Sequence, residues 1–341
     1  MPLAIRISST SSVPKYRQVA GAIRQAIERR LIAREEQLPS LNELRVRHGV
    51  SRDTAEKAYR LLKQEGVIIS VRGKGYYAAR ATAPPRQRIL LVFPALNPQQ
   101  EAIHQSFVGA VGSRASVDLR VYGYDVDRFV SVLEQHTEAF TDFVIAPVFR
   151  GEAAVRARDA VDRLLAGRRV TLLDRPLPGL RQPYRSVVQN REGDILSALE
   201  VLLPRLRHYA RLHLLFPFDG HLDPGTVRGV QDFGRRYDIP VRVSFKGFGT
   251  IVPEAGTVYL TVRDEELATV VRGLSGSELT VGKDVGLLTY DDGPLKEVLL
   301  GGITVVSTRY GDMGRATAGM ILENRWEHVE SDFVLTERQS L

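Results

Sequence analysis

Apolar runs of strand length alternate with helical patterns from residue 88 onward. Parallel strands need crossover connections, so this alternation predicts a parallel sheet covered by helices on both faces. The runs are Ile89 to Phe93, Leu119 to Tyr122, Phe143 to Val148, Val170 to Leu173, Leu212 to Phe216, Val241 to Phe245, Val258 to Val262 and Val285 to Thr289. Eight strands is a large number for one sheet, and the series breaks near residues 176–190 before a new one begins. The sequence therefore predicts an α/β region of two similarly constructed lobes, with a ligand bound between them.

The segment at residues 81–87 separates this α/β region from the N-terminal part. It reads Ala-Thr-Ala-Pro-Pro-Arg-Gln and has no apolar periodicity, and its two adjacent prolines cannot join a helix or a sheet ladder. A chain of 341 residues also exceeds what one hydrophobic core usually serves. We therefore predict one domain at residues 1–80, a linker at 81–87 and a two-lobed domain at 88–341.

Positive charge is concentrated in the predicted N-terminal domain. Its 80 residues contain 16 basic and 7 acidic side chains, whereas residues 81–341 contain 31 and 33. Such an excess on a small domain is typical of a protein that binds a polyanion. The chain contains no cysteine, and its first 30 residues carry neither a secretory signal nor a membrane span, so we expect a cytoplasmic protein.

Three helices are predicted in this N-terminal domain. A first helix of about 16 residues is indicated by apolar side chains at steps of three and four. These are Tyr16, Val19, Ala20, Ile23, Ile27 and Leu31. A second helix is expected to begin at Ser40, because Ser40 and Glu43 have the spacing of a capping box, and to end at Gly49. A third is expected from Ser51 to Gln64.

A short hairpin is expected after the third helix. Strands at 67–71 and 76–79 flank the basic tip Arg72-Gly73-Lys74-Gly75, which can lie along a phosphate backbone or enter a minor groove. The third helix is polar on its outer face, where Arg52 and Lys57 lie, and such a helix can enter a major groove. The alternative is a small domain whose charges form a solvated face. The combination of three helices, a basic wing and local positive charge favours a winged helix-turn-helix that binds DNA.

Residues 15–78 resemble the N-terminal domain of GntR-family regulators. The resemblance rests on Leu38-Pro39-Ser40, Leu44, Val50 to Thr54, Ala58-Tyr59, Leu62, Gly66 and Gly73 to Tyr76. The family usually places an arginine where this chain has Asn42, and some members place one where it has Glu56. The expected DNA contacts are Ser40, Asn42, Ser51, Arg52, Thr54, Lys57, Gly73, Lys74 and Gly75.

Polar residues follow several of the predicted strands. Asn97 comes after the first run, Asp174 and Arg175 after the fourth, and Asp291 and Asp292 after the last. In parallel sheets, ligands bind beyond the carboxyl ends of the strands, and carboxylates with a guanidinium can hold the vicinal hydroxyls of a sugar. The alternative for each position is an ordinary turn-forming residue.

Residues 88 to about 324 resemble the sensor domains of LacI-type repressors and ribose-binding proteins, which have the periplasmic-binding-protein-like (type I) fold. The resemblance rests on Leu172 to Arg175, Val187 to Asn190, Gly286 to Asp292, Ile303-Thr304 and Met313-Gly314. The resemblance implies sugar-contacting roles for Asp174, Arg175 and Asp291. Asp264 and Thr308 correspond more loosely to ligand-contact positions of these relatives. Sugar-binding relatives carry an arginine where this chain has Thr226. The full set of expected effector contacts is Asn97, Asp174, Arg175, Thr226, Asp264, Asp291 and Thr308.

No enzymatic motif is evident in the sequence. The seven histidines show no metal-ligand spacing, no Gly-x-Ser-x-Gly elbow occurs, and Gly73-Lys74-Gly75 lacks the rest of a phosphate-binding loop. The lysines beyond residue 80 are Lys246, Lys283 and Lys296, and none lies in a pyridoxal-phosphate motif. We expect no enzyme activity, cofactor or metal. The rival hypothesis is a sugar-binding or enzymatic α/β domain with a basic interaction module.

The combined resemblances predict a homodimeric transcription regulator of carbohydrate genes, most simply a repressor. Two symmetry-related heads would bind a pseudo-palindromic double-stranded DNA operator, because one recognition helix contacts only a half-site. The effector would be a monosaccharide or a derivative of one. Regulators of L-arabinose and L-fucose use have a similar arrangement, and L-fucose is one candidate among several. Whether the effector releases or promotes DNA binding stays open.

Overall fold

The computed structural model describes residues 14–341, apart from 29–30, 34, 65, 72, 80–86, 218–221, 246–248 and 250. The chain divides into two compact units between Arg86 and Gln87. Residues 81–86 of the predicted linker lie outside the described residues. Gln87 belongs to a strand rather than to a linker, because it pairs with Ala115 in the first sheet of the second unit. No helix among the described residues is long and apolar enough to cross a membrane.

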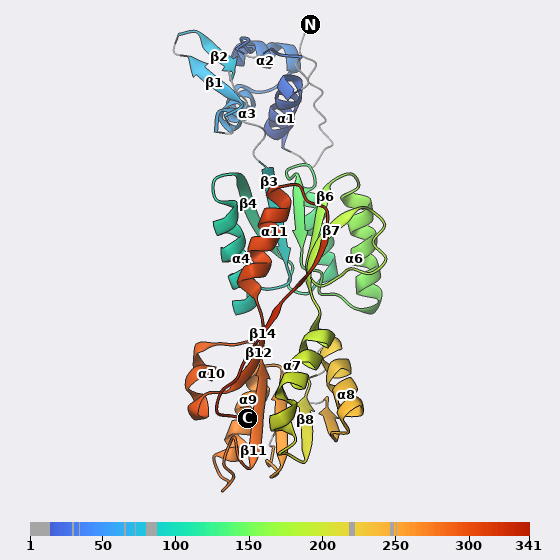
Figure 1. Cartoon of the computed structure of the whole chain (residues 1–341). Helices are drawn as coiled ribbons and strands as arrows, with labels where there is room; N and C mark the ends of the chain where they lie inside the picture. Colours follow the sequence, from blue (N-terminus) through green and yellow to red (C-terminus); the bar gives the residue numbers. More distant parts are fainter. Residues whose placement is uncertain are drawn as a thin grey trace. The chain divides into compact units, whose positions relative to one another are not determined.

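The N-terminal unit contains three helices and a two-stranded antiparallel sheet (Figure 1). These elements are α1 (Lys15–Glu28), α2 (Leu41–His48), α3 (Arg52–Gln64), β1 (Ile68–Val71) and β2 (Gly75–Ala78). Their apolar faces form one core around Ile23, Leu44 and Leu62. Leu31 was predicted to belong to the apolar stripe of the first helix, but it lies beyond the end of α1 and its side chain is exposed.

A third segment completes the wing. Gln37 forms an antiparallel bridge with Tyr77, and the backbone N–H of Leu38 donates to Tyr76 O at 2.8 Å. Tyr59 on α3 is fully buried and donates its hydroxyl to Pro39 O. The hairpin is therefore attached to the helices through the residues that precede α2.

The first lobe of the second unit contains a six-stranded sheet whose strands are all parallel, in the order β13-β7-β6-β5-β3-β4. Its strands are β3 (Gln87–Phe93), β4 (Ala115–Val121), β5 (Asp142–Ile145), β6 (Arg169–Asp174), β7 (Tyr184–Gln189) and β13 (His328–Ser331). Its helices are α4 (Pro98–Val111), α5 (Val126–His136), α6 (Gly151–Leu164) and α11 (Tyr310–Leu322). Two separate apolar clusters cover the faces of the sheet, one with α4 and α11 and the other with α5 and α6.

The second lobe has a sheet in the order β14-β12-β11-β10-β8-β9, in which only β14 is antiparallel to its neighbour. Its strands are β8 (Arg211–Leu215), β9 (Val241–Ser244), β10 (Thr257–Thr261), β11 (Val285–Tyr290), β12 (Thr304–Thr308) and β14 (Phe333–Thr336). Its helices are α7 (Arg191–Leu206), α8 (Gly225–Tyr237), α9 (Asp264–Leu274) and α10 (Pro294–Val298), followed by a 3₁₀ turn at Leu299–Gly301. The predicted α/β class and the two parallel-sheet lobes are confirmed.

The chain returns to the first lobe after it has built most of the second. Figure 1 shows α11, in red, lying against α4, and the two helices are in contact. β13 then pairs with β7 of the first sheet before β14 pairs with β12 of the second. The lobes are therefore joined by three crossings of the chain and are not consecutive in sequence.

The predicted break at residues 176–190 is wrong in its second half, where β7 lies. Arg185 and Ser186 interrupt the apolar pattern of this strand, and both are buried. The Arg185 guanidinium is accommodated by Asp142, at 3.0 Å, and by the Thr171 hydroxyl, at 2.8 Å. A charged side chain with partners on nearby strands of the same sheet can thus be buried within a strand.

Candidate functional site

The predicted DNA-contacting residues of the N-terminal unit lie at the starts of α2 and α3 and at the tip of the wing. Ser40 caps α2: its side chain accepts the N–H of Glu43 at 3.1 Å, while Glu43 accepts the N–H of Ser40 at 2.7 Å. The predicted capping box is therefore present. Asn42 is exposed on the first turn of this helix.

At the start of α3, Ser51 accepts the N–H of Thr54 at 3.1 Å, and the two hydroxyls lie 2.8 Å apart. Arg52 is exposed and makes no ion pair or hydrogen bond with another described residue, so its guanidinium is available to an external partner. Lys57 pairs with Asp53 at 2.9 Å. Among the described residues, the N-terminal end of α3 thus presents the unpaired Arg52 guanidinium beside a fixed pair of hydroxyls.

Glu56 stands where some GntR-type heads carry an arginine, and in this structure its charge is paired. Its carboxylate lies 3.2 Å from the Arg60 guanidinium, one turn further along α3. Exposed pairs of this kind contribute little to stability, but the pairing lowers the repulsion that a lone carboxylate would exert on phosphate.

The wing tip depends on two glycines. Gly73 has φ +74° and Gly75 has φ +103°, conformations that side-chain-bearing residues rarely adopt. Between them, Lys74 is exposed, and its carbonyl accepts Gln37 Nε2 at 2.8 Å and the Tyr77 hydroxyl at 3.3 Å. The backbone of the tip is held in place while the Lys74 ammonium projects into solvent.

In the second unit, the carboxyl ends of the strands of the two lobes meet. We call this region the inter-lobe junction; it comprises Gln99, Asp174, Gln189, Arg191, Asp291, Thr308 and Tyr310. Gln189 connects the lobes directly, because its Nε2 donates to Asp174 of the first lobe and its Oε1 accepts the Thr308 hydroxyl of the second at 2.8 Å. The junction therefore brings together Asp174, Thr308 and Asp291, three of the seven predicted effector contacts.

Asp291 accepts hydrogen bonds with both of its carboxylate oxygens. The Tyr310 hydroxyl donates to Oδ1 at 2.7 Å and Gln99 Nε2 donates to Oδ2 at 3.0 Å. Burial raises the pKa of Tyr310, and the neighbouring Asp291 carboxylate raises it further, so the phenol stays protonated as a donor. Asp291 thus links β11 of the second lobe to α4 and to the start of α11.

Arg191 lies at the centre of this network. Its Nη2 is 3.4 Å from the Tyr310 hydroxyl, and its guanidinium carbon is 5.5 Å from the centroid of the Tyr290 ring. Burial alone would lower its pKa, but Tyr310, Asp291 and other nearby acidic groups raise it, so Arg191 is a cation.

Two of the predicted aspartates have strained backbones. Asp174 has φ +70° and lies at the centre of a tight turn in which the N–H of Arg175 donates to Leu173 O at 2.8 Å. Asp291 has φ +58°. Such conformations cost free energy and are frequent at ligand sites, where they aim a side chain. Both carboxylates point into the junction, as their partners show.

The remaining predicted effector residues are placed differently. Arg175 is near Asp174, with 3.9 Å between Nε and Oδ2, and Thr226 is buried and hydrogen-bonds the side chain of Tyr290. Asn97 caps α4 by accepting the N–H of Gln100 at 3.0 Å. Asp264 begins α9 with an exposed side chain that pairs with Lys296 at 2.9 Å.

Four junction residues were not predicted, namely Gln99, Gln189, Arg191 and Tyr310. Gln189 ends a strand that the sequence pattern concealed, and Arg191 begins the helix after it. Tyr310 begins a helix that returns to the first lobe, so its position beside Asp291 depends on packing between segments distant in sequence. A search for polar residues at the end of β7, the start of α7 and the start of α11 would have found three of the four.

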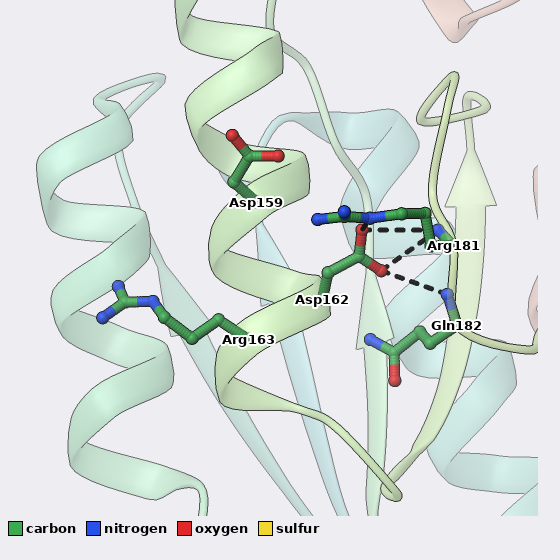
Figure 2. A pocket seen from close by; sticks show the side chains of 5 residues that line it. All are labelled: Asp159, Asp162, Arg163, Arg181 and Gln182. Atoms are coloured by element: carbon green, nitrogen blue, oxygen red, sulfur yellow. Dashed lines mark hydrogen bonds and ion pairs between the residues drawn. The ribbon is translucent and has the colours of Figure 1, made fainter.

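A surface pocket in the first lobe lies away from this junction. Asp159, Asp162, Arg163, Arg181 and Gln182 line it, as Figure 2 shows. Asp162 already accepts the backbone N–H groups of Arg181 and Gln182 and the Arg181 side chain. These residues precede β7 and therefore lie at the amino edge of the sheet. We assign the pocket a structural role, because its carboxylate is satisfied by the loop itself.

Asp194, on the first turn of α7, gives a pH-dependent prediction. Burial raises its pKa to about 6; Arg191 counteracts this, and Glu330 and Asp332 add to it. Because the folded pKa exceeds the ordinary aspartate value, the protonated form stabilises the fold, and this contribution is lost as pH rises from about 4 to 6. Asp194→Asn is expected to stabilise the protein by about 1 kcal/mol at pH 7.5 and to have no effect at pH 4. Urea denaturation at both pH values measures this; a gain that persists at pH 4 would contradict it.

Comparison with known proteins agrees with the geometry of the N-terminal unit. Residues 15–77 match the family model described as bacterial regulatory proteins, gntR family. Residues 15–77 form a GntR-type helix-turn-helix. Over 73 residues the chain is 33% identical to the HTH-type transcriptional repressor YtrA of Bacillus subtilis strain 168, a match that covers 21% of this chain and 56% of YtrA. The chain thus spans about half the length of that curated relative.

The two lobes are similar to solved LacI-type structures. A LacI family transcriptional regulator from Enterococcus faecium with bound ribose is 17% identical, with a TM-score of 0.58, over 74% of this chain and 98% of that one. The Lac repressor dimer bound to operator and an anti-inducer is 16% identical, with a TM-score of 0.60, over 76% and 95%. The second unit therefore shares the fold of these LacI-type structures.

Proposed function

We propose that this protein is a transcription regulator that binds operator DNA through its GntR-type head and is controlled by a small effector held at the inter-lobe junction. The observation that supports this most is that one chain combines two features: an exposed Arg52 at the start of the predicted recognition helix, and a polar network at the strand ends of a unit with a LacI-type fold. A regulator needs these two parts and no catalytic group.

The proposed effector is a monosaccharide or a derivative of one, bound by Asp174, Arg175, Asp291 and Thr308. Carboxylates and a guanidinium at strand ends suit the hydroxyls of a sugar, and a structurally similar regulator was solved with ribose. L-Fucose is one candidate. Because the effector would replace hydrogen bonds that now link the lobes, its binding would change their relative arrangement.

A homodimer is the proposed assembly, since two recognition helices are needed for the two halves of a palindromic operator. Coupling between effector and DNA must be reciprocal: operator DNA should change effector affinity by the same factor that effector changes DNA affinity. For such an effector-controlled DNA-binding protein, the simplest physiological role is to repress carbohydrate genes in the cytoplasm.

Arg52→Ala tests the DNA-binding half of the proposal. A gel shift with fragments from the protein's own gene neighbourhood should show salt-sensitive, sequence-selective binding by the unmodified chain. Loss of a base contact is expected to weaken this binding about 10- to 100-fold, because a bidentate arginine contact contributes about 1–3 kcal/mol.

The matched control is Arg17→Ala, which removes the same charge from an exposed position on α1. This substitution removes only long-range attraction to DNA, which salt screens. It is therefore expected to weaken binding by no more than about threefold. Equal losses in both variants would assign binding to net charge rather than to the recognition helix. Absence of any shift at low salt would overturn the regulator proposal.

A further inference from the structure

Three arginines at the inter-lobe edge of the first sheet carry buried nitrogens that have no hydrogen-bond partner among the described residues. These atoms are Arg150 Nη2, Arg175 Nε and Arg191 Nε. A buried donor left unpaired costs about 1–3 kcal/mol, and more when it is charged, so three on one edge need an explanation.

The three side chains occupy equivalent places in the fold. Arg150 lies between β5 and α6, Arg175 directly follows β6, and Arg191 begins α7 after β7. Because β5, β6 and β7 are adjacent in the sheet and parallel, their carboxyl ends bring the three guanidinium groups to one edge.

Charged groups of both lobes affect the pKa of Arg150. Burial lowers its pKa, repulsion from Arg175 lowers it further, and Asp223 at the start of α8 opposes both effects. Arg150 and Arg175 repel each other, and an anion bound between the two guanidinium groups would remove this repulsion.

The carboxylates of the junction already accept hydrogen bonds from other groups, and none accepts one from these three nitrogens. Both oxygens of Asp291 accept hydrogen bonds, from Tyr310 and Gln99. Asp174 accepts Gln189, and Asp223 accepts the N–H of Gly225 at 2.8 Å. The three unsatisfied arginine nitrogens are donors. A neutral sugar brings a donor with every hydroxyl, whereas an anion brings only acceptors and therefore matches these nitrogens better.

We propose that the edge formed by Arg150, Arg175 and Arg191 binds the anionic group of the effector, which would be a phosphorylated or carboxylate-bearing polyol rather than a neutral sugar. Guanidinium groups match the oxygens of phosphate and carboxylate in a planar, two-pronged geometry. This inference rests on the proposed effector site and specifies the chemical class of its ligand.

Inorganic phosphate is the probe that tests it. Isothermal titration of the full chain at constant ionic strength is expected to show saturable binding, and Arg150→Gln to raise the dissociation constant at least about tenfold, as loss of a charge-assisted hydrogen bond requires. Arg150→Lys keeps the charge but loses the two-pronged geometry, so an intermediate affinity is expected. Arg150→Gln removes a desolvated, repelled cation and should therefore not unfold the protein.

Two controls locate the binding. Arg163→Gln removes an exposed arginine from the same lobe and Arg17→Gln one from α1 of the head, and both should bind phosphate as the unmodified chain does. Phosphate affinity lost only in Arg17→Gln, or unchanged in Arg150→Gln, would overturn the inference, as would the absence of saturable phosphate binding.

Matched pairs of compounds separate this inference from the proposed function. Glucose 6-phosphate and glucuronate are expected to raise the melting temperature more than glucose at equal concentration, because only they supply an anion. Stabilisation by neutral sugars alone would contradict the anionic subsite and leave the regulator proposal intact. The gel shift described above tests that proposal without any of these compounds.

Discussion

Asp142→Ala is expected to lower the free energy of unfolding of the first lobe by about 3–5 kcal/mol, the usual cost of removing one partner of a buried ion pair. Asp142 and Arg185 are both fully buried, with 3.0 Å between Oδ1 and Nη2. Asp142 also accepts two hydrogen bonds from Arg169, at 2.8 and 2.7 Å. Without the carboxylate, the Arg185 cation would remain buried and largely uncompensated.

The network reaches beyond the sheet. Arg185 Nε donates to Thr171 on β6 at 2.8 Å, and Nη1 donates to Met320 O on α11 at 3.1 Å. Loss of Asp142 would therefore loosen the returning helix as well as the pairing of β5, β6 and β7. We expect the first lobe to unfold at a lower denaturant concentration than the second.

Trp326 provides the measurement. It is the single tryptophan of the chain, and the Arg185 guanidinium carbon lies 5.3 Å from the centroid of its ring. Its fluorescence during guanidinium titration therefore reports on the region that the substitution disturbs. The matched control is Asp159→Ala, because Asp159 is half exposed and pairs with Arg158 at the surface. That variant should lie within about 0.5 kcal/mol of the unmodified chain, and similar losses in both would contradict the assigned role.

The same buried arginine explains what the sequence could not predict about the fold. All eight apolar runs became strands, because continuous or alternating apolar segments of that length are typical of strands in a sheet covered by helices. β7 was missed, since Arg185 and Ser186 break its apolar pattern and their partners lie on other strands. β13 and β14 have only four residues each and are only partly buried or exposed.

The sequence also could not predict the lobe to which each helix belongs. Nothing local in α11 indicates that it packs on α4 rather than on the second sheet, because the apolar face of a helix does not encode its partner. The capping box of α2, by contrast, was predictable, because both of its hydrogen bonds depend on residues three apart.

For the candidate site, strand-end reasoning gave Asp174 and Asp291, and the resemblance added Thr308; the structure places these three at a common junction. Neither kind of reasoning could rank the seven predicted residues. Asp264 pairs with Lys296 at an exposed position, and Asn97 uses its carbonyl oxygen to cap a helix. Their roles in binding an effector stay predictions. Gln189 and Tyr310 complete the network through contacts between elements far apart in sequence, which periodicity cannot reveal.

Gly314→Ala is expected to destabilise the first lobe by about 3 kcal/mol, although alanine is the better helix former. A Cβ atom at Gly314 would lie 2.4 Å from Ile103 O and 3.1 Å from Phe107 N, both in the backbone of α4. Backbone atoms cannot rotate away, so α11 would have to move off the sheet. Tyr310 at the start of α11 donates to Asp291, and the displacement should therefore also weaken the inter-lobe junction.

Gly319→Ala in the same helix is the control with the opposite sign. A Cβ there would meet only the end of the flexible Arg325 side chain, at 3.6 Å. The higher helix propensity of alanine should then stabilise the protein by up to about 1 kcal/mol. Guanidinium titration followed by Trp326 fluorescence measures both variants. A stabilised Gly314→Ala protein would show that α11 does not depend on close backbone contact with α4. It would also contradict the expected effect of this contact on the hydrogen bond between Tyr310 and Asp291.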